Sequence, residues 1–253
     1  MPRAMPYRKK LSAGGAPGDN GGMKPLHIGI AACSAEGAAL CYRTICTEAP
    51  ALIAPHAHPE VSLHTPSLAD YMALIYRGDW AGVGEMMLAS AHKLKQMGAD
   101  FLICPDNTIH QAFDLVEHRS PRPWLHIARE VAKEAQGRQF KRLGVLGTRY
   151  LMEGPVYPET LKAQGIEYRI PGAEQRERTN RIIFDELVNA QFLPRSLAYY
   201  VEVIRGLQDE GCDAVVLGCT EIPLLVTAES SPLPILDSTR LLARAAVRKA
   251  VEG

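Results

Sequence analysis

The sequence lacks an excess of charge of either sign and has no long hydrophobic run. Its 253 residues contain 28 Lys and Arg against 28 Asp and Glu, which gives a formal net charge of 0. A chain without a net positive field attracts neither nucleic acid nor an anionic membrane surface. Gly, Pro or charged residues interrupt every apolar stretch before the roughly 18 to 20 residues that a membrane-spanning helix needs. We therefore expect a soluble protein without nucleic-acid or membrane partners.

Export and metal-binding signals are also lacking. Residues 1–22 are rich in basic residues, Pro and Gly but have no apolar core of about 7 to 15 residues, so they do not form a secretory signal. We interpret them as a disordered leader or a cloning remnant. Six cysteines without an export signal indicate free thiols in a reducing compartment, and the cytoplasm is the predicted location. Because no CxxC pair, HxxEH-like motif or Gly-rich phosphate loop occurs, we expect neither a metal nor an organic cofactor.

Strand-like and helical patterns alternate along the chain. The composition, 47% hydrophobic and 22% charged, is that of a folded globular protein. Continuous runs of Val, Ile, Leu and Ala separated by helices are typical of parallel strands that helices cover on both faces, so we predict an α/β protein. The expected strands are residues 26–31, 60–65, 99–105, 142–148, 166–171 and 213–218, and the expected helices are residues 35–50, 78–98, 154–165, 175–190, 195–210 and 238–251.

The two halves of the sequence resemble each other. Residues 98–108 (GADFLICPDNT) align with residues 211–221 (GCDAVVLGCTE) at a constant offset of 113, and the strand at Ile28 aligns with the strand at Leu143 at an offset of 115. Each longer segment is a glycine after a helix, then a strand, then a polar cluster. Because two matches share nearly the same offset, we predict two similar α/β halves related by an approximate twofold axis.

We place the boundaries of the two halves by this repeat. The first predicted domain comprises residues 23–120 together with the C-terminal helix 238–253, and the second comprises residues 121–237. An active site is expected in the cleft between them, because open α/β sheets bind ligands beyond the carboxyl ends of their strands.

Both polar clusters follow the carboxyl end of a predicted strand. Asp106, Asn107 and Thr108 do so in the first half, and Cys219 and Thr220 do so in the second. If the halves face one another, Asp106 and Cys219 lie where they can add and remove a proton on opposite faces of one carbon. The neighbouring amide and hydroxyl groups would bind a substrate carboxylate and take up the charge that develops. The alternative is that the polar residues cap helices and Cys219 is a buried thiol.

Other residues near the strand ends are secondary candidates. Thr148 is expected to bind a carboxylate, with helix capping as the alternative role. Cys104 points to the same face of its strand as Asp106 and is the alternative first thiol. Glu221 is interpreted as a structural residue near a helix N-terminus. Candidates that would line the cleft, orient a carboxylate or supply a cation, but that suit surface or packing roles as well, are His64, Thr65, Ser67, His110, Arg149 and Arg181.

Four segments, in their order and spacing, resemble the cofactor-independent aspartate/glutamate racemase family (the Asp/Glu/hydantoin racemase superfamily). They are CPDNTIH (104–110), LGTRYLMEGPVYPETL (146–161), RIIFDEL (181–187) and VLGCTEIPLL (216–225). The similarity covers nearly the whole chain from about residue 26. It implies two Rossmann-like domains with the active site between them, no pyridoxal phosphate, no metal and a homodimer. It also implies an isomerase that racemises a small carboxylic amino acid such as aspartate or glutamate.

The sequence departs from this family at one of its two facing cysteines. Cys219 matches the second cysteine, but Asp106 stands where the family has the first. A free carboxyl group has a pKa of ~3.9 against ~8.5 for a thiol, so Asp106 would be the weaker base. Three alternatives stay open: an asymmetric racemase, a lyase, decarboxylase or cis-trans isomerase that uses one thiol, and a non-catalytic ligand-binding homologue. Cys33, in a first loop that also differs from the family, and Thr65 complete the predicted substrate-binding residues.

Overall fold

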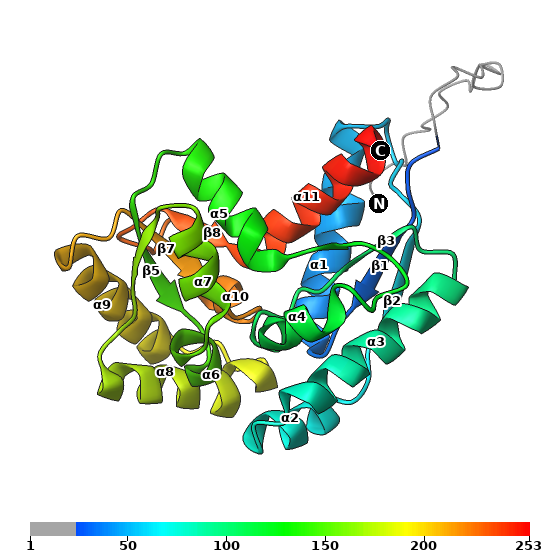
Figure 1. The fold of residues 1–253 in the computed structure, drawn as a ribbon. Coiled ribbons are helices and arrows are strands. Elements are labelled where there is room, and N and C mark those ends of the chain that lie inside the picture. The colour runs from blue at the N-terminus through cyan, green and yellow to red at the C-terminus, as the bar shows by residue number, and fades with distance from the viewer. Residues whose placement is uncertain (1–23) are drawn as a thin grey trace, which may run out of the picture.

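The structure, a computed structural model, describes residues 24–253, and the leader predicted for residues 1–22 lies outside them. The strands are β1 (Ile28–Ala31), β2 (Val61–His64), β3 (Phe101–Ile103), β4 (Trp124–Leu125), β5 (Arg142–Leu146), β6 (Glu167–Arg169), β7 (Ala214–Leu217) and β8 (Ile235–Asp237). They form two parallel four-stranded sheets, β2-β1-β3-β4 and β6-β5-β7-β8, in two lobes (Figure 1). The predicted α/β class with two similar domains is confirmed.

Helices cover both faces of each sheet. They are α1 (Ala35–Glu48), α2 (Leu68–Tyr76), α3 (Trp80–Gln96), α4 (Phe113–Val116), α5 (Ile127–Gly137), α6 (Arg149–Glu153), α7 (Val156–Ala163), α8 (Ala173–Asp185), α9 (Pro194–Asp209), α10 (Ile222–Leu225) and α11 (Ser238–Glu252). Short 3-10 turns are η1 (Ala49–Ala51), η2 (Thr108–Ala112) and η3 (Leu187–Asn189). Because helices lie on both faces, the central strands β1 and β7 are buried along their whole length.

The strand pairing reproduces the repeat seen in the sequence. Ile28 of β1 pairs with Phe101 of β3, and Leu143 of β5 pairs with Ala214 of β7. The first members of these pairs differ by the predicted offset of 115 residues, and the second members differ by the predicted 113. Strands β3 and β7 therefore hold equivalent places in the two sheets, and the polar clusters that follow them leave the sheets at equivalent points.

Equivalent glycines end the helices before these two strands. Gly98 follows α3 with φ of 96°, and Gly211 follows α9 with φ of 83°. Glycine adopts this left-handed conformation without the steric cost that a Cβ atom brings, and so it ends a helix and redirects the chain. The glycine stops of the repeat thus set where β3 and β7 begin.

Each lobe also receives a helix from the other half of the chain. Helix α5 follows β4, a strand of the first sheet, yet its Val131 packs in the same buried cluster as Leu143 of the second sheet. Helix α11 follows β8 of the second sheet, yet its Leu242 shares a buried cluster with Ile28 of the first. The predicted domain boundary after residue 120 is therefore too early, because β4 pairs with β3. A two-residue strand beside prolines has too few residues to show an alternating pattern.

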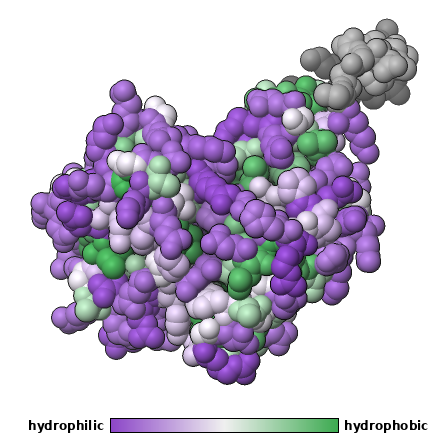
Figure 2. Space-filling model, viewed as in Figure 1, coloured by the Kyte–Doolittle hydropathy of each residue, from purple (hydrophilic) through white to green (hydrophobic). Residues whose placement is uncertain are grey.

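Membrane helices, cysteines, the surface and metal-ligand groups were the other features that the sequence addressed. No helix within residues 24–253 is long and apolar enough to cross a membrane. All six cysteines are free, in agreement with the expectation drawn from the lack of an export signal. The face seen in Figure 2 is mostly hydrophilic, and its hydrophobic residues form separate patches. In the described part of the chain, no three His, Cys, Asp or Glu side chains are grouped so that they could hold a metal ion.

Candidate active site

A pocket lies between the two sheets, where strands of both lobes end. Residues that follow β1, β3, β5 and β7 all line it. Seven of the eight residues that the sequence predicted for the site are among them: Cys33, Asp106, Asn107, Thr108, Thr148, Cys219 and Thr220. The eighth, Thr65, is exposed, and its hydroxyl donates to the carbonyl of Pro66 at 3.2 Å. The approximate symmetry of the fold thus brings the two polar clusters to one cavity.

The Asp106 carboxylate is held by backbone N–H groups at the start of α1. Oδ2 accepts the N–H of Cys33 at 2.8 Å, and Oδ1 accepts the N–H of Ser34 at 3.3 Å. The side chain is 8% exposed, and burial raises the pKa of Asp106 to about 6, although the hydrogen bonds from Cys33 and Ser34 act in the opposite direction. At neutral pH Asp106 is mostly ionised, and it is a stronger base than a carboxylate in water.

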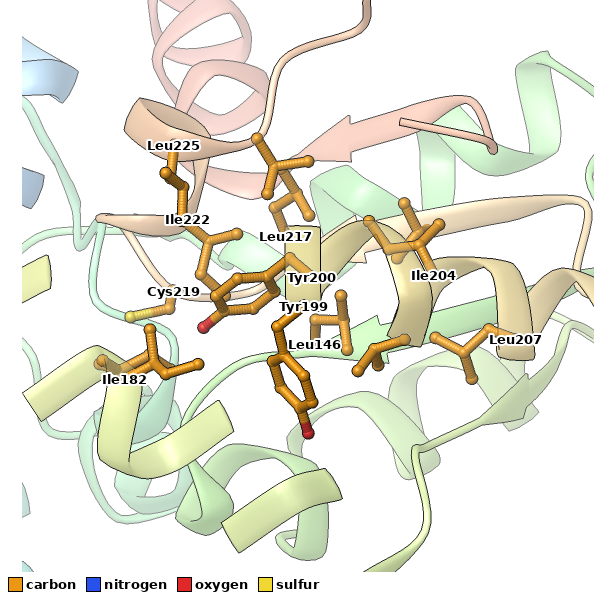
Figure 3. Packing of buried hydrophobic residues seen from close by; sticks show 14 of the residues in the cluster. Leu146, Ile182, Tyr199, Tyr200, Ile204, Leu207, Leu217, Cys219, Ile222 and Leu225 are labelled. Carbon is orange, nitrogen blue, oxygen red and sulfur yellow. The ribbon is translucent and has the colours of Figure 1, made fainter. Parts of the chain in front are cut away.

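The Cys219 thiol lies on the other side of the pocket and is kept protonated. Its Sγ donates to Oε2 of Glu221 at 2.9 Å. Burial first, and then the negative charges of Glu221 and Asp106, raise the pKa of Cys219 well above its usual range. Figure 3 shows Cys219 at the edge of the buried cluster that contains Ile182 and Tyr200. Cys219 is therefore a proton donor at neutral pH, whereas Asp106 is an acceptor.

Glu221 lies near a helix N-terminus, as the sequence suggested, and it also lines the pocket. It is the N-cap residue of α10, but its side chain makes no hydrogen bond to that helix. Its Oε2 accepts the Thr220 hydroxyl at 2.8 Å as well as the Cys219 thiol, and the residue is 3% exposed. Its place in the sequence could have indicated a role in the site, since Glu221 directly follows Cys219 and Thr220.

Hydroxyl pairs join the two lobes across the pocket. The Oγ1 atoms of Thr108 and Thr148 lie 3.1 Å apart, and Oγ of Ser34 lies 3.2 Å from Oγ1 of Thr220. Thr148 and Ser34 are also the N-cap residues of α6 and α1, so the capping role considered for Thr148 is confirmed. Helix capping fixes these two side chains in place and lets the same hydroxyls border the pocket.

The side chain of Asn107 forms hydrogen bonds to two residues of the second half of the chain. Its Oδ1 accepts the Tyr157 hydroxyl at 2.8 Å, and its Nδ2 donates to Oγ of Ser238 at 2.9 Å. Ser238 in turn donates to the carbonyl of Leu217 at 2.9 Å. This network crosses from the first lobe to the second, so the amide of Asn107 holds the ends of β3 and β7 together and fixes the orientation of its own side chain.

Backbone groups are better placed than the Asn107 amide to bind a carboxylate. Within residues 24–253, the N–H groups of Asn107, Thr108 and Thr220 donate to no protein acceptor. All three residues line the pocket. Free N–H groups beyond the carboxyl ends of parallel strands are a common means of binding anions.

His110 and Cys104 support Asp106 from outside the pocket. Nδ1 of the buried His110 lies 2.9 Å from the backbone carbonyl of Asp106, so His110 positions the main chain and not the carboxylate. Burial lowers the pKa of His110 to about 4, and the ring is neutral at pH 7. Cys104 is fully buried, with Sγ 3.6 Å from the same carbonyl, and it does not line the pocket.

The remaining secondary candidates have other contacts. Nδ1 of His64 lies 3.0 Å from Oγ of Ser90, and Ser67 caps α2. Arg149 and Arg181 are exposed and outside the pocket, and Arg149 forms an ion pair of 3.4 Å with Glu177. Neither of the two arginines considered as a cation therefore lines the cavity.

The charge of Glu221 gives a testable effect on the Cys219 thiol. Replacing Glu221 by glutamine removes a negative charge and exchanges the carboxylate acceptor of the thiol for a neutral amide, and both changes favour the thiolate, so the pKa of Cys219 should fall. Peptide-resolved alkylation with iodoacetamide as a function of pH measures this. Glu221→Gln should shift the reactivity of Cys219 to lower pH, whereas the exposed control Glu229→Gln should not. An unchanged profile in Glu221→Gln would mean that the contact with Glu221 does not control this thiol.

Comparison with known proteins supports the resemblance found in the sequence. The family described as Asp/Glu/Hydantoin racemase matches residues 30–246. The broad specificity amino-acid racemase RacX of Bacillus subtilis (strain 168) is 28% identical over 166 residues, which are 64% of this chain and 69% of that protein. A solved structure of a candidate Asp/Glu racemase from Yersinia pestis is 30% identical with a TM-score of 0.80, covering 89% of this chain and 99% of that one. An aspartate racemase homologue from Pyrococcus horikoshii OT3 is 27% identical with a TM-score of 0.76, covering 90% and 99%.

Proposed function

Because the chain belongs to the Asp/Glu/hydantoin racemase family, we propose that it is an isomerase that moves the α-proton of a small carboxylic acid from one face of the α-carbon to the other. One observation carries the proposal: Asp106 and Cys219 follow equivalent strands of the two sheets and line one pocket from opposite lobes. A proton acceptor and a proton donor on two sides of a bound carbon are what a racemisation requires.

The two groups have the protonation states that one direction of the reaction needs. The ionised Asp106 takes the α-proton, and the electrons of the C–H bond pass into the carboxylate to form an enolate. The thiol of Cys219 then donates its proton to the opposite face and becomes a thiolate. The free N–H groups of Thr108 and Thr220 and the nearby hydroxyls stabilise the added charge. Proton exchange with water restores the starting state.

The reverse direction needs a protonated Asp106 and an ionised Cys219. That arrangement is rare because the pKa of Cys219 is well above its usual range and the pKa of Asp106 is about 6. The equilibrium constant between enantiomers is unity, so kcat/KM has to be equal for both. The two enantiomers can therefore differ in kcat and in KM because the bases are unequal, but any difference in kcat is matched by the same factor in KM.

A second function is favoured by the protonated state of Cys219. A buried thiol with a raised pKa suits the protonation of a carbanion on one face only, as after loss of carbon dioxide from a substrate. Asp106 would then have no role in proton transfer. Such chemistry is a lyase reaction with a single acid, and it stays the alternative together with a protein that only binds its ligand.

Proton exchange in deuterated water separates these functions. The protein is incubated with candidate acids, and NMR follows the α-proton while chiral chromatography follows configuration. Exchange with inversion is the result that the proposed function predicts. Exchange with retention would favour one-sided chemistry, and binding without exchange would favour a ligand-binding protein.

The pH dependence of the reaction follows from the two groups. Since Asp106 acts as a carboxylate with a pKa of about 6, kcat/KM should rise as the pH increases through about 6 and should be lost below it. It should fall again only at alkaline pH, where Cys219 loses its proton. The two limbs belong to the pair of groups and should be the same for both enantiomers. Initial rates between about pH 4.5 and about pH 10 test this, and a profile without an acidic limb would exclude a carboxyl base.

Other properties implied by the resemblance stay predictions. They are a homodimer, a cytoplasmic location, and activity without metal or organic cofactor. The resemblance also implies aspartate or glutamate as the substrate, and the lining of the pocket argues against these two acids. Light scattering after size-exclusion chromatography measures the oligomeric state directly.

A further inference from the structure

The pocket has a polar end and an apolar end. The strand-end residues, with Asp106 and Cys219, form the polar end. The other end is lined by α2 of the first lobe and by α8 and η3 of the second. The apolar side chains that these elements contribute are Leu68, Met72, Ile75, Ile183, Phe184 and Val188.

The side chains at this apolar end leave part of their apolar surface exposed to solvent. Leu68, Met72, Phe184 and Val188 are only half-buried, although they face a pocket whose polar end is closely packed. A ligand group that removes this surface from water gains free energy in proportion to the apolar area that it covers. A carboxylate placed there would lose its hydration, and beside these six apolar side chains the hydroxyl of Tyr150, which packs against the same cluster, is the one side-chain donor it would meet.

The charges around the pocket also disfavour a second carboxylate. Among residues 24–253, the charged residues that line it are Asp106 and Glu221, and no lysine, arginine or histidine does. Arg149, the nearest basic residue in sequence to the lining, is exposed and forms an ion pair with Glu177. A dicarboxylic substrate would therefore carry an unpaired charge into a cavity that already holds two acidic groups.

We infer that the substrate is an α-substituted carboxylic acid with an apolar side chain, and not a dicarboxylic acid. This inference rests on the proposed function, since it takes the strand ends as the place where the α-carbon and its carboxylate are held. The substrate's α-carboxylate then binds the polar end, and its side chain extends between α2 and α8.

The first test is a comparison of substrates with the wild-type protein. Deuterium exchange at the α-carbon is measured for both enantiomers of leucine, methionine and phenylalanine, and for aspartate and glutamate. We expect kcat/KM for the best apolar substrate to exceed that for glutamate by about tenfold or more, the discrimination typical of a difference in one or a few apolar groups. A preference for aspartate or glutamate overturns the inference while leaving the proposed function intact.

A variant pair tests the position of the side-chain site. Met72→Arg puts a cation at the apolar end and should shift the ratio of kcat/KM values towards glutamate by about tenfold or more. The matched control Ala73→Arg adds the same charge to the neighbouring, exposed position of α2, outside the pocket, and should leave the ratio unchanged. Equal shifts in both variants, or none in Met72→Arg, would place the side-chain site elsewhere.

Binding keeps the inference testable if no acid shows exchange. Titration calorimetry of the same acids with Cys219→Ala measures affinity without turnover. Tighter binding of apolar acids supports the inference even where the proposed function fails. Tighter binding of glutamate, or no binding of any of these acids, overturns it, and a loss of glutamate affinity in Arg149→Ala would identify the cation that the inference excludes.

Discussion

Replacing Cys219 by alanine is expected to lower the rate of racemisation at least about 100-fold, the usual contribution of a positioned acid or base. The variant removes the proton donor of one face and leaves Asp106 alone on the other. Cys219→Ser is also expected to fail, because a hydroxyl is far harder to deprotonate than a thiol. Chiral chromatography of a confirmed substrate measures both rates.

The control for this result is another cysteine of the same chain. Cys46→Ala removes a half-buried thiol outside the pocket and should retain wild-type activity. Thermal unfolding shows whether Cys219→Ala is folded. If folded Cys219→Ala keeps a rate within about tenfold of the wild type, Cys219 is not the acid or base, since even a modest contribution to proton transfer exceeds that factor.

Asp106→Asn is expected to have an effect of similar size, at least about 100-fold on racemisation. An amide cannot take up the α-proton, and it can accept only one of the N–H groups that Cys33 and Ser34 donate to the carboxylate. The acidic limb of the pH profile should disappear from any residual activity. Initial rates for both enantiomers measure the loss.

Asp106→Cys tests whether position 106 acts as a base or only accepts the N–H groups of Cys33 and Ser34. A thiol there is the residue that the resemblance implies at this position, so we expect racemisation to be preserved or increased if the N–H groups of the α1 loop accept the exchange. If Asp106→Asn instead leaves both enantiomers unaffected while Cys104→Ala abolishes activity on one, Cys104 is the first base. That outcome would require the end of β3 to change conformation, because Cys104 lies outside the pocket.

The sequence predicted the repeat well because buried parallel strands are short continuous apolar runs. All six expected strands are present, and the offsets of 113 and 115 match the observed pairing. The strands β4 and β8 were missed, because they are short and lie directly after proline-containing segments, where no continuous apolar run marks a strand. Helix α2 was missed because apolar residues, among them Leu68, Met72 and Ile75, occur nearly all round it. As a result, the apolar end of the pocket was not predicted, since α2 supplies three of its six apolar side chains.

The site was predicted from strand ends, and its errors have physical causes. Residues next to β3 and β7 were found because the ends of equivalent strands meet at one cleft. Thr65 lies outside it because β2 is an outer strand of its sheet. The role of Glu221 depends on a contact to Cys219, two residues before it, inside a turn that no periodic pattern describes. The apolar end depends on residues of α2 and α8 such as Met72 and Phe184, which are 112 residues apart in the sequence and line one pocket only in the folded chain.

The most direct test of the two-sided site is deuterium exchange measured separately for each enantiomer in Asp106→Asn and Cys219→Ala. With one base left, each variant should exchange the α-proton of one enantiomer with retention of configuration, because the remaining group removes and returns hydrogen on its own face. The account predicts opposite enantiomers for the two variants, with Asp106 serving one face and Cys219 the other. If both variants exchange the same enantiomer, or if Asp106→Asn still inverts its substrate at the wild-type rate, Asp106 and Cys219 do not act on opposite faces of one carbon.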